Sequence, residues 1–393
     1  MMAPVVTSCP HVGQEEALSR LTNGDNYFIT GDGGTGKSHI LREYMSWCRS
    51  NGRNVVSAAP TAMAGINIGG TTLHRLFGLN SGCSAKTIEE IRKRLENADV
   101  VVVDEVSMVS ANMIDDVTKR LSEFGLYPQI VTAGDFHQLP PVNGGNRYAF
   151  ESDSWKSLNF KPLLLEENYR FGDELTCRLG HMARIGDTRC LEEYERISSK
   201  CIMDNEHYLC SRHEKVNSYN AEYVDELPGN ERVYKAITHG YGIEDEDYTE
   251  AYARILTLKE GAEVMITVND KELRYYNGMT GHIKFLLDDE IDIVTDSGDL
   301  VKIYRNKHFI NAQEDQYIRQ FPIKLARALT VHKAQGQTWD AVNLVADRFW
   351  ENGHLYVALS RCRDVRNIHI VGELDPKYLK CSEKVKKFYD CLR

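Results

Sequence analysis

The stretch Tyr27–Ser38, YFITGDGGTGKS, decides the fold of this chain, because it sets a glycine-rich loop between an apolar strand and an amphipathic helical stretch. Glycines at these positions let backbone N–H groups turn inward around phosphate oxygens. Lys37 can then reach the β- and γ-phosphates of a nucleotide, and Ser38 can ligate Mg²⁺. The pattern predicts a nucleotide site, whose other loop contacts are expected from Gly31, Gly33, Gly34, Thr35 and Gly36.

Three more short apolar runs, Asn54–Ala58, Val100–Val103 and Gln129–Ala133, end in loops of Gly, Asp, Pro or Thr, as Tyr27–Thr30 does. Strands that alternate with helical stretches favour an α/β fold with a parallel sheet covered on both faces. In such sheets ligands bind beyond the carboxyl ends of the strands. The loops that follow these runs are therefore the expected place for chemistry.

An acidic pair, Asp104 and Glu105, follows the Val100–Val103 run directly. A fully apolar run of valines is typical of a buried parallel strand, at whose end carboxylates are costly unless they serve a purpose. Asp104 can hold Mg²⁺ together with Ser38, and Glu105 can accept a proton from an attacking water. Together with the glycine-rich loop, this pair predicts ATP hydrolysis with ATP and Mg²⁺ bound.

Composition narrows the class of protein without deciding it. A length of 393 residues predicts two or three domains, and the net charge of −10 argues against attachment to DNA by bulk electrostatics alone. It leaves open a narrow basic groove or one that stacks on bases. The chain lacks a membrane-length apolar run and a secretory signal, so we expect a soluble, intracellular protein, with nucleus, mitochondrion, bacterial cytoplasm and virus-infected cell all open. The spacing of Cys201, His207, Cys210 and His213 matches no common zinc pattern.

Several later segments occur in a recognisable order. Gly134–Val142 reads GDFHQLPPV, and its two prolines would stiffen a link leading away from the nucleotide. With the loop and the acidic pair, these segments resemble the motifs of superfamily 1 helicases, above all the petite-integration-frequency (Pif) type and the related Dda and RecD-type enzymes. The other segments that carry the resemblance are Ala59–Gly78, Ser107–Leu121, LEENYRF (Leu165–Phe171), LARALTVHKAQGQTWD (Leu325–Asp340) and YVALSRCR (Tyr356–Arg363).

The resemblance implies roles at the nucleotide beyond those derived above. Gln14 matches the glutamine that reads the adenine edge, and Gln138 matches the sensor of the γ-phosphate. Arg170 and Arg361 match two arginines that approach the γ-phosphate from the second domain, and Gly336 is expected beside the nucleotide. An arginine donated across a cleft stabilises transition-state charge only when the cleft closes.

The resemblance also implies contacts with DNA. Arg327 stands where relatives often carry an aromatic residue, and Ala334 stands where a serine is usual, so a lost hydroxyl would weaken one contact with the backbone of the strand. For Phe77, packing in the core is as good an alternative as stacking on a base. The expected DNA contacts are Pro60, Thr61, His74 and Phe77 in the first domain and His332 and Lys333 in the second.

The implied architecture is two tandem RecA-like P-loop domains with a small SH3-like β-barrel inserted in the second. Residues 1–165 are expected to form the first domain, with a duplex-splitting wedge near 73–93. Residues 166–258 and 319–393 are expected to form the second. The β-barrel is expected at 259–318, where short β patterns alternate with turn sequences such as DSGD.

The function implied is an ATP-dependent DNA helicase that moves 5′ to 3′ on single-stranded DNA and unwinds forked duplexes, working as a monomer. Its direction of travel rests on the resemblance alone. One alternative is a translocase that strips proteins or anneals strands without unwinding. Another is a P-loop kinase or ATP-dependent binding module without a nucleic-acid track, and RNA in place of DNA also stays open.

Overall fold

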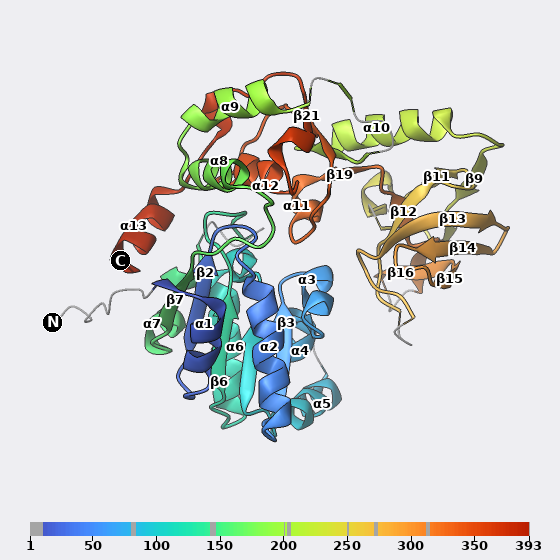
Figure 1. Cartoon of the computed structure of the whole chain (residues 1–393). Coiled ribbons are helices and arrows are strands. Elements are labelled where there is room, and N and C mark those ends of the chain that lie inside the picture. The colour runs from blue at the N-terminus through green and yellow to red at the C-terminus, as the bar shows by residue number, and fades with distance from the viewer. Residues whose placement is uncertain are drawn as a thin grey trace. The chain divides into compact units, whose positions relative to one another are not determined.

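The computed structural model describes residues 11–79, 84–141, 147–199, 201–202, 206–249, 251–270, 274–311 and 315–392. The chain forms two compact units (Figure 1). The first unit comprises Met1–Met203 and Ala334–Arg393, and the second comprises Asp204–Lys333.

The centre of the first unit is a seven-stranded sheet in the order β1-β7-β2-β6-β5-β3-β4, with every neighbouring pair parallel. The four strands expected from the apolar runs are all present, each within one residue of its predicted bounds, which confirms the α/β prediction. The strands are β1 (His11–Val12), β2 (Tyr27–Gly31), β3 (Val55–Ala59), β4 (Thr71–Thr72), β5 (Val100–Val103), β6 (Gln129–Ala133) and β7 (Lys161–Leu165).

Helices cover both faces of this sheet (Figure 1). Successive side chains of a strand point to opposite faces, so Val100 and Val102 pack in one core cluster while Val101 and Val103 pack in the other. The helices α1 and α2 contribute to the first cluster, and α4, α5, α6, α7 and α13 contribute to the second. The bounds are α1 (Gln14–Leu21), α2 (Lys37–Ser50), α3 (Ala62–Asn67), α4 (Leu73–Phe77), α5 (Ala85–Leu95), α6 (Ala111–Glu123), α7 (Asp153–Ser157) and α13 (Glu383–Leu392).

The rest of the first unit lies beyond the sheet in sequence. The strands β20 and β21 form a parallel pair, and α8 and α12 contact each other. Five short 3₁₀ turns occur among the described residues of the whole chain, at Val106–Met108, Ala149–Glu151, Asp245–Asp247, Val365–Asn367 and Pro376–Tyr378. The bounds are α8 (Glu174–Ile185), α9 (Arg189–Ile197), β20 (Val342–Val345), α12 (His354–Leu359) and β21 (Ile368–Val371).

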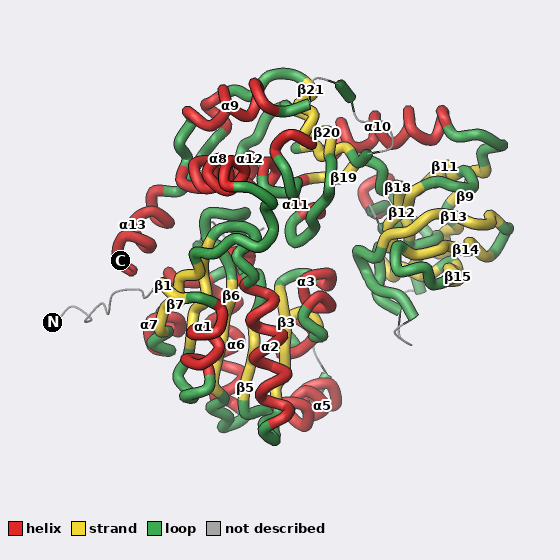
Figure 2. The backbone as a smooth tube through the Cα atoms, in the orientation of Figure 1, coloured by secondary structure: helices red, strands yellow, loops and turns green. Residues whose placement is uncertain are grey.

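The second unit is rich in β structure, as the sequence between 259 and 318 predicts. Its largest sheet is antiparallel, in the order β15-β14-β13-β12-β18 (Figure 2). A separate antiparallel sheet has the order β10-β17-β16. The pairs β11-β9 and β19-β8 complete it. The bounds are β8 (Tyr208–Cys210), α10 (His213–Glu226), β9 (Arg232–Lys235), β10 (Ile237–His239), β11 (Ile255–Leu258), β12 (Glu263–Ile266), β13 (Thr280–Leu286), β14 (Glu290–Thr295), β15 (Leu300–Tyr304), β16 (Asn306–Asn311), β17 (Gln316–Gln320), β18 (Ile323–Leu325), β19 (Ala328–Thr330) and α11 (Val331–Ala334).

The compact units do not follow the expected domain boundaries residue by residue. Residues 166–203 and 334–393 belong to the same unit as the predicted first domain. The finer division into 1–165, 166–258 with 319–393, and 259–318 therefore stays a prediction, as does the wedge, whose residues 80–83 lie outside the described part of the chain. None of the helices described has the length and apolar character needed to cross a bilayer.

Candidate active site

The glycine-rich loop joins the end of β2 to the start of α2 and has the backbone shape that its sequence predicts. Gly31, Gly34 and Gly36 have φ values of +149°, +93° and +82°. A Cβ at Gly31 would lie 2.5 Å from the Leu165 carbonyl oxygen, so both the turn and the close approach require glycine. The Lys37 ammonium donates to the carbonyl oxygens of Gly31 and Asp32, at 2.8 Å each. These contacts hold it at the mouth of the loop, where phosphates are expected.

The acidic pair lies beside this loop. The Ser38 hydroxyl donates to one Asp104 carboxylate oxygen at 2.6 Å, and the other accepts from the Glu105 N–H at 2.8 Å. Glu105 has a left-handed backbone with φ of +51°, rare for a residue other than glycine. Burial, with repulsion from Glu105, raises the pKa of Asp104 to about 7. A hydroxyl next to a buried carboxylate is the oxygen ligand set that Mg²⁺ prefers, so Ser38 and Asp104 fit the ion.

One cavity of about 320 Å³ brings most of the predicted nucleotide residues together. It opens at the carboxyl ends of the β2 and β5 strands, the edge where parallel sheets bind ligands. The predicted residues that line it are Gly33, Gly34, Gly36, Lys37, Ser38, Asp104, Glu105, Gln138, Arg170 and Arg361.

Arg361 is a buried residue of this cavity whose charged side chain bonds to neutral groups. It is 1% exposed, and its guanidinium donates only to neutral acceptors: the Val357 and Gln337 carbonyl oxygens at 2.9 and 3.1 Å and the Ser360 hydroxyl at 2.8 Å. Within the described residues, no carboxylate lies at ion-pair distance from it. Burial lowers the pKa of Arg361. A buried cation without a counter-ion is costly, so this group is set up to receive an anion.

Arg170 approaches the same cavity from the segment after β7. Its guanidinium donates to the Ser360 carbonyl oxygen at 3.4 Å, next to Arg361 in the chain. The segment is fixed to the glycine-rich loop, because the Asn168 side chain donates to the Gly33 carbonyl oxygen at 2.7 Å. The Tyr169 N–H also donates to the Gly34 carbonyl oxygen, at 2.9 Å. Both arginines therefore reach the loop within one compact unit.

A buried ion-pair network supports the loop from behind. Arg184 donates through Nε to both oxygens of the Asp135 carboxylate, at 3.0 and 3.1 Å, and its NH1 lies 3.2 Å from Asp32. Although burial raises the pKa of Asp135, the charge of Arg184 holds it well below its ordinary value. The Tyr356 hydroxyl donates to Asp135 at 3.0 Å and accepts from the Gly33 N–H at 3.1 Å. This network ties α8 and α12 to the nucleotide loop.

The other predicted nucleotide residues lie close to the loop. The Gln14 amide donates to the Thr35 carbonyl oxygen at 3.3 Å. The Gln335 amide donates to the Glu105 carboxylate at 3.2 Å, and a Cβ built on neighbouring Gly336 would lie 3.8 Å from that carboxylate. Gln335 thus contacts the expected general base.

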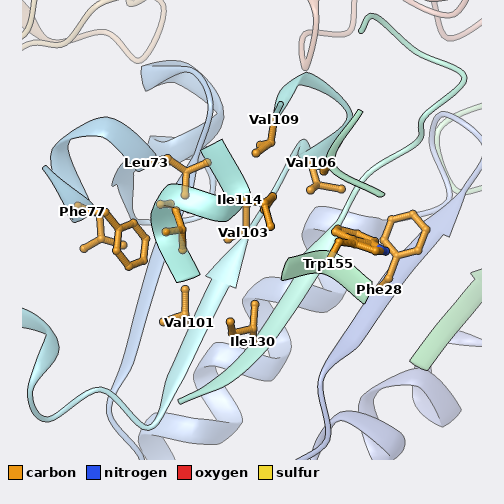
Figure 3. Close-up of a cluster of buried hydrophobic side chains, with 14 of the residues drawn as sticks. Phe28, Leu73, Phe77, Val101, Val103, Val106, Val109, Ile114, Ile130 and Trp155 are labelled. Atoms are coloured by element: carbon orange, nitrogen blue, oxygen red, sulfur yellow. The ribbon is translucent and has the colours of Figure 1, made fainter. Parts of the chain in front are cut away.

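The residues predicted to contact DNA in the first domain differ in how far they are buried. Pro60, Thr61 and His74 are half-buried near the carboxyl end of β3, where Thr61 caps α3 by accepting from the Ala64 N–H at 3.3 Å. The prediction for Phe77 is wrong, because its ring is fully buried in the core cluster that also contains Leu73 and Val101 (Figure 3). A ring packed in the core cannot stack on a base, and the alternative of a core residue holds.

The predicted contacts in the second unit lie on α11. His332 is half-buried, and Lys333 is exposed. Arg327, which departs from the family pattern, lies 3.5 Å from the Glu263 carboxylate and 5.2 Å from the centre of the Tyr223 ring. The Arg327 side chain therefore makes contacts within the protein that stabilise the fold.

Sequence reasoning missed several residues of the site. Asn168 and Tyr356 lie in two of the segments that carry the family resemblance. Their place in those segments was the signal that could have identified them. Asp135 stands in GDFHQLPPV, but nothing near it in sequence points to Arg184. The further cavity residues that were missed are His39, Arg42, Tyr169, Thr338 and Arg363.

Comparison with known proteins gives a consistent result. A family model described as PIF1-like helicase matches residues 14–179, and one described as UvrD-like helicase C-terminal domain matches residues 325–364. The ATP-dependent DNA helicase Pif1 of Bdellovibrio bacteriovorus is 30% identical, covering 96% of this chain and 90% of the relative. Human ATP-dependent DNA helicase PIF1 is 31% identical, covering 98% of this chain and 64% of that protein.

Solved structures agree with the sequences. The Pif1 helicase of Candida albicans superposes with a TM-score of 0.83 at 27% identity, covering 98% of this chain and 99% of that one. The Bacteroides Pif1 helicase, solved in complex with ADP-AlF3 and single-stranded DNA, gives 0.83 at 26% identity, covering 99% and 97%.

Proposed function

The chain belongs to the Pif1-like helicase family, and on this premise we propose that it couples ATP hydrolysis to 5′-to-3′ movement along single-stranded DNA and unwinds duplex DNA. One observation carries the proposal most directly. Arg361 and Arg170 line the same cavity as Lys37 and the acidic pair Asp104 and Glu105. Cations of this kind distinguish a motor that responds to the γ-phosphate from a site that merely holds a nucleotide.

In the proposed hydrolysis, Glu105 accepts a proton from a water whose oxygen attacks the γ-phosphorus, and the bond to the β-phosphate oxygen breaks to give ADP and phosphate. Lys37 balances the charge on the β- and γ-oxygens. Mg²⁺, held by Ser38 and Asp104, supplies further charge neutralisation when bound. We propose that the Gln138 side chain contacts the γ-phosphate and acts as its sensor. Gln14 is proposed to read the adenine edge.

The γ-phosphate would give Arg361 a close counter-ion, which no carboxylate among the described residues provides at ion-pair distance. We propose that this attraction draws the guanidinium groups of Arg361 and Arg170 towards the γ-phosphate, and that hydrolysis releases them. Such a cycle changes the arrangement of the motor once for each ATP. The protein moves along a strand if its DNA contacts bind and release that strand in alternation during the ATP cycle.

For the strand itself we propose contacts from Pro60, Thr61 and His74, and from His332 and Lys333. Stacking and backbone contacts of this kind tolerate any base sequence, as a motor requires. We further propose the two RecA-like domains, with an SH3-like barrel built from the strands between 259 and 318 and a wedge near 73–93. The antiparallel order β15-β14-β13-β12-β18 supports the barrel.

The proposal is tested by ATP hydrolysis with and without oligo(dT). We expect strong stimulation by the oligonucleotide and loss of hydrolysis in Lys37→Ala, with DNA binding retained. Lys161→Ala is the matched control, because this exposed lysine pairs with Asp25 on the surface. Hydrolysis that does not respond to DNA would favour a kinase or a binding module instead.

A further inference from the structure

The three-stranded sheet of the second unit carries two ordered rows of side chains on one face. The cross-strand register of β10, β17 and β16 brings residues of one row directly opposite each other. One row, here called the aromatic row, consists of His239, Tyr317 and Phe309, and the next, the basic row, consists of Ile237, Arg319 and Lys307.

This face points to solvent, whereas the opposite face packs inward at β17 and β16. On the inner face Ile318 is fully buried, and His308 stacks on Tyr252 with ring centres 4.9 Å apart. On the outer face Phe309 is 48% exposed and Ile237 is 49% exposed. The Tyr317 ring between them is half-buried. Large apolar side chains gathered on one exposed face indicate a contact surface.

The rings of the aromatic row are already arranged. His239 stacks on Tyr317 with ring centres 5.0 Å apart and an interplanar angle of 18°, and Phe309 meets Tyr317 edge-on at 5.7 Å. The Lys307 ammonium lies 3.8 Å from the centre of the Tyr317 ring. Little side-chain entropy remains to be lost when a flat ligand binds here.

The charge of the face favours a polyanion. Lys307 and Arg319 are both exposed, and the Asp315 carboxylate lies 3.5 Å from the His239 ring. The two rows themselves contain these two cations and no carboxylate, although the acidic turn Glu244–Asp247 follows β10 and the whole chain has a net charge of −10. Aromatic rings interleaved with cations match single-stranded nucleic acid, whose bases stack and whose phosphates pair with cations. A duplex keeps its base faces covered and offers only the phosphates.

We propose that the outer face of β10-β17-β16 is a binding surface for single-stranded DNA, additional to the motif residues of the motor. Bases stack on the aromatic row, and Lys307 and Arg319 contact phosphates. The proposal deepens the proposed function and rests on it for the presence of a single strand. This surface would bind the part of the single-stranded DNA that the motif residues of the motor do not contact.

The test compares two double variants of the full chain. Lys307→Ala with Phe309→Ala removes one cation and one ring from the rows. Lys284→Ala with Phe285→Ala is the matched control, because Phe285 is also 48% exposed and its lysine lies 5.6 Å from the ring centre, against 5.7 Å for Lys307 and Phe309. Fluorescence anisotropy with labelled oligo(dT) gives the affinity of each protein.

We expect the row variant to bind oligo(dT) about tenfold more weakly or worse, with the control unchanged. The slope of log affinity against log salt should fall by about 0.7, the value for one lost phosphate contact on a single strand. Equal affinities in the two variants and the wild type would overturn the proposal, and so would equal losses in both. A loss confined to duplex DNA would also overturn it.

A second measurement uses the unaltered protein. Ultraviolet cross-linking to an oligonucleotide containing 5-bromodeoxyuridine, followed by mass spectrometry, should give an adduct on a peptide carrying Phe309 or Tyr317. Adducts on the motor motifs alone would contradict the proposal. Hydrolysis of ATP at saturating oligo(dT) separates the two questions, because it should be unchanged in the row variant. Its absence in the wild type would count against the helicase function, not against the surface.

Discussion

Replacing Arg361 by alanine should separate its role in catalysis from its role in folding. Its guanidinium makes three hydrogen bonds to neutral acceptors, from 2.8 to 3.1 Å. Hydrogen bonds to a charged group contribute about 1.5–3 kcal/mol each, or roughly 5–9 kcal/mol in all. Removing the cation also ends a desolvation cost of several kcal/mol per buried ion, which the charges of Glu105 and Asp135 offset only in part. The two effects nearly cancel, so we expect the unfolding free energy without nucleotide to change by less than about 2 kcal/mol.

Hydrolysis should respond very differently. Loss of an arginine that stabilises the transition state lowers turnover by about 10³–10⁵-fold, which corresponds to about 4–7 kcal/mol. Single-turnover hydrolysis with saturating oligo(dT) measures this, while titration with a fluorescent ATP analogue measures nucleotide affinity, which should change much less. The control is Arg366→Ala, an exposed arginine paired with Asp364 and Asp173, and it should leave both quantities unchanged.

Two results would refute this reasoning. Turnover of the Arg361→Ala protein within about tenfold of the wild type would remove Arg361 from the transition state. A loss of about 3–5 kcal/mol in unfolding free energy without nucleotide would show that the residue behaves like one half of a buried structural pair.

Three further outcomes are expected. Because the pKa of Asp104 is raised to about 7, its carboxyl is protonated below that pH and cannot ligate a metal, so the affinity for Mg²⁺ with nucleotide should rise as pH increases through 7 and then level off; a titration at pH 6 and pH 8 checks this, and a flat profile would contradict it. Arg184→Met should lower the unfolding free energy by about 3–5 kcal/mol in urea denaturation, since it leaves the Asp135 carboxylate buried without its partner, and a neutral effect would argue against the network. Phe77→Ala should cost about 3–5 kcal/mol of stability, yet oligo(dT) affinity of the folded protein should be unchanged; selective loss of affinity would restore Phe77 as a DNA contact.

The sequence predicted the parts of the fold and site that leave a local pattern. The valines of β5 and the polar residues after them mark a buried parallel strand, so its bounds and the acidic pair followed directly. The glycines of the loop report the backbone conformation that they alone adopt easily. In both cases the physical cause acts within a few residues of the chain.

What could not be predicted depends on residues far apart in the chain. Arg184 and Asp135 are joined only by folding, and each alone resembles a surface charge. The apolar spacing of Phe77 fits a core position as well as a stacking one, and only the neighbouring Leu73 and the sheet decide between them. Likewise, the rows on β10, β17 and β16 exist only through strand register, and 76 residues of chain lie between β10 and its partner β17.

The most direct test of a directional motor is strand release from matched duplexes that carry either a 5′ or a 3′ single-stranded tail, with ATP hydrolysis followed in the same reaction. The account predicts that the wild type releases the strand from the 5′-tailed duplex and not from the 3′-tailed one, and that Lys37→Ala releases neither. Hydrolysis without release from the 5′-tailed duplex, or release from the 3′-tailed duplex alone, would contradict it.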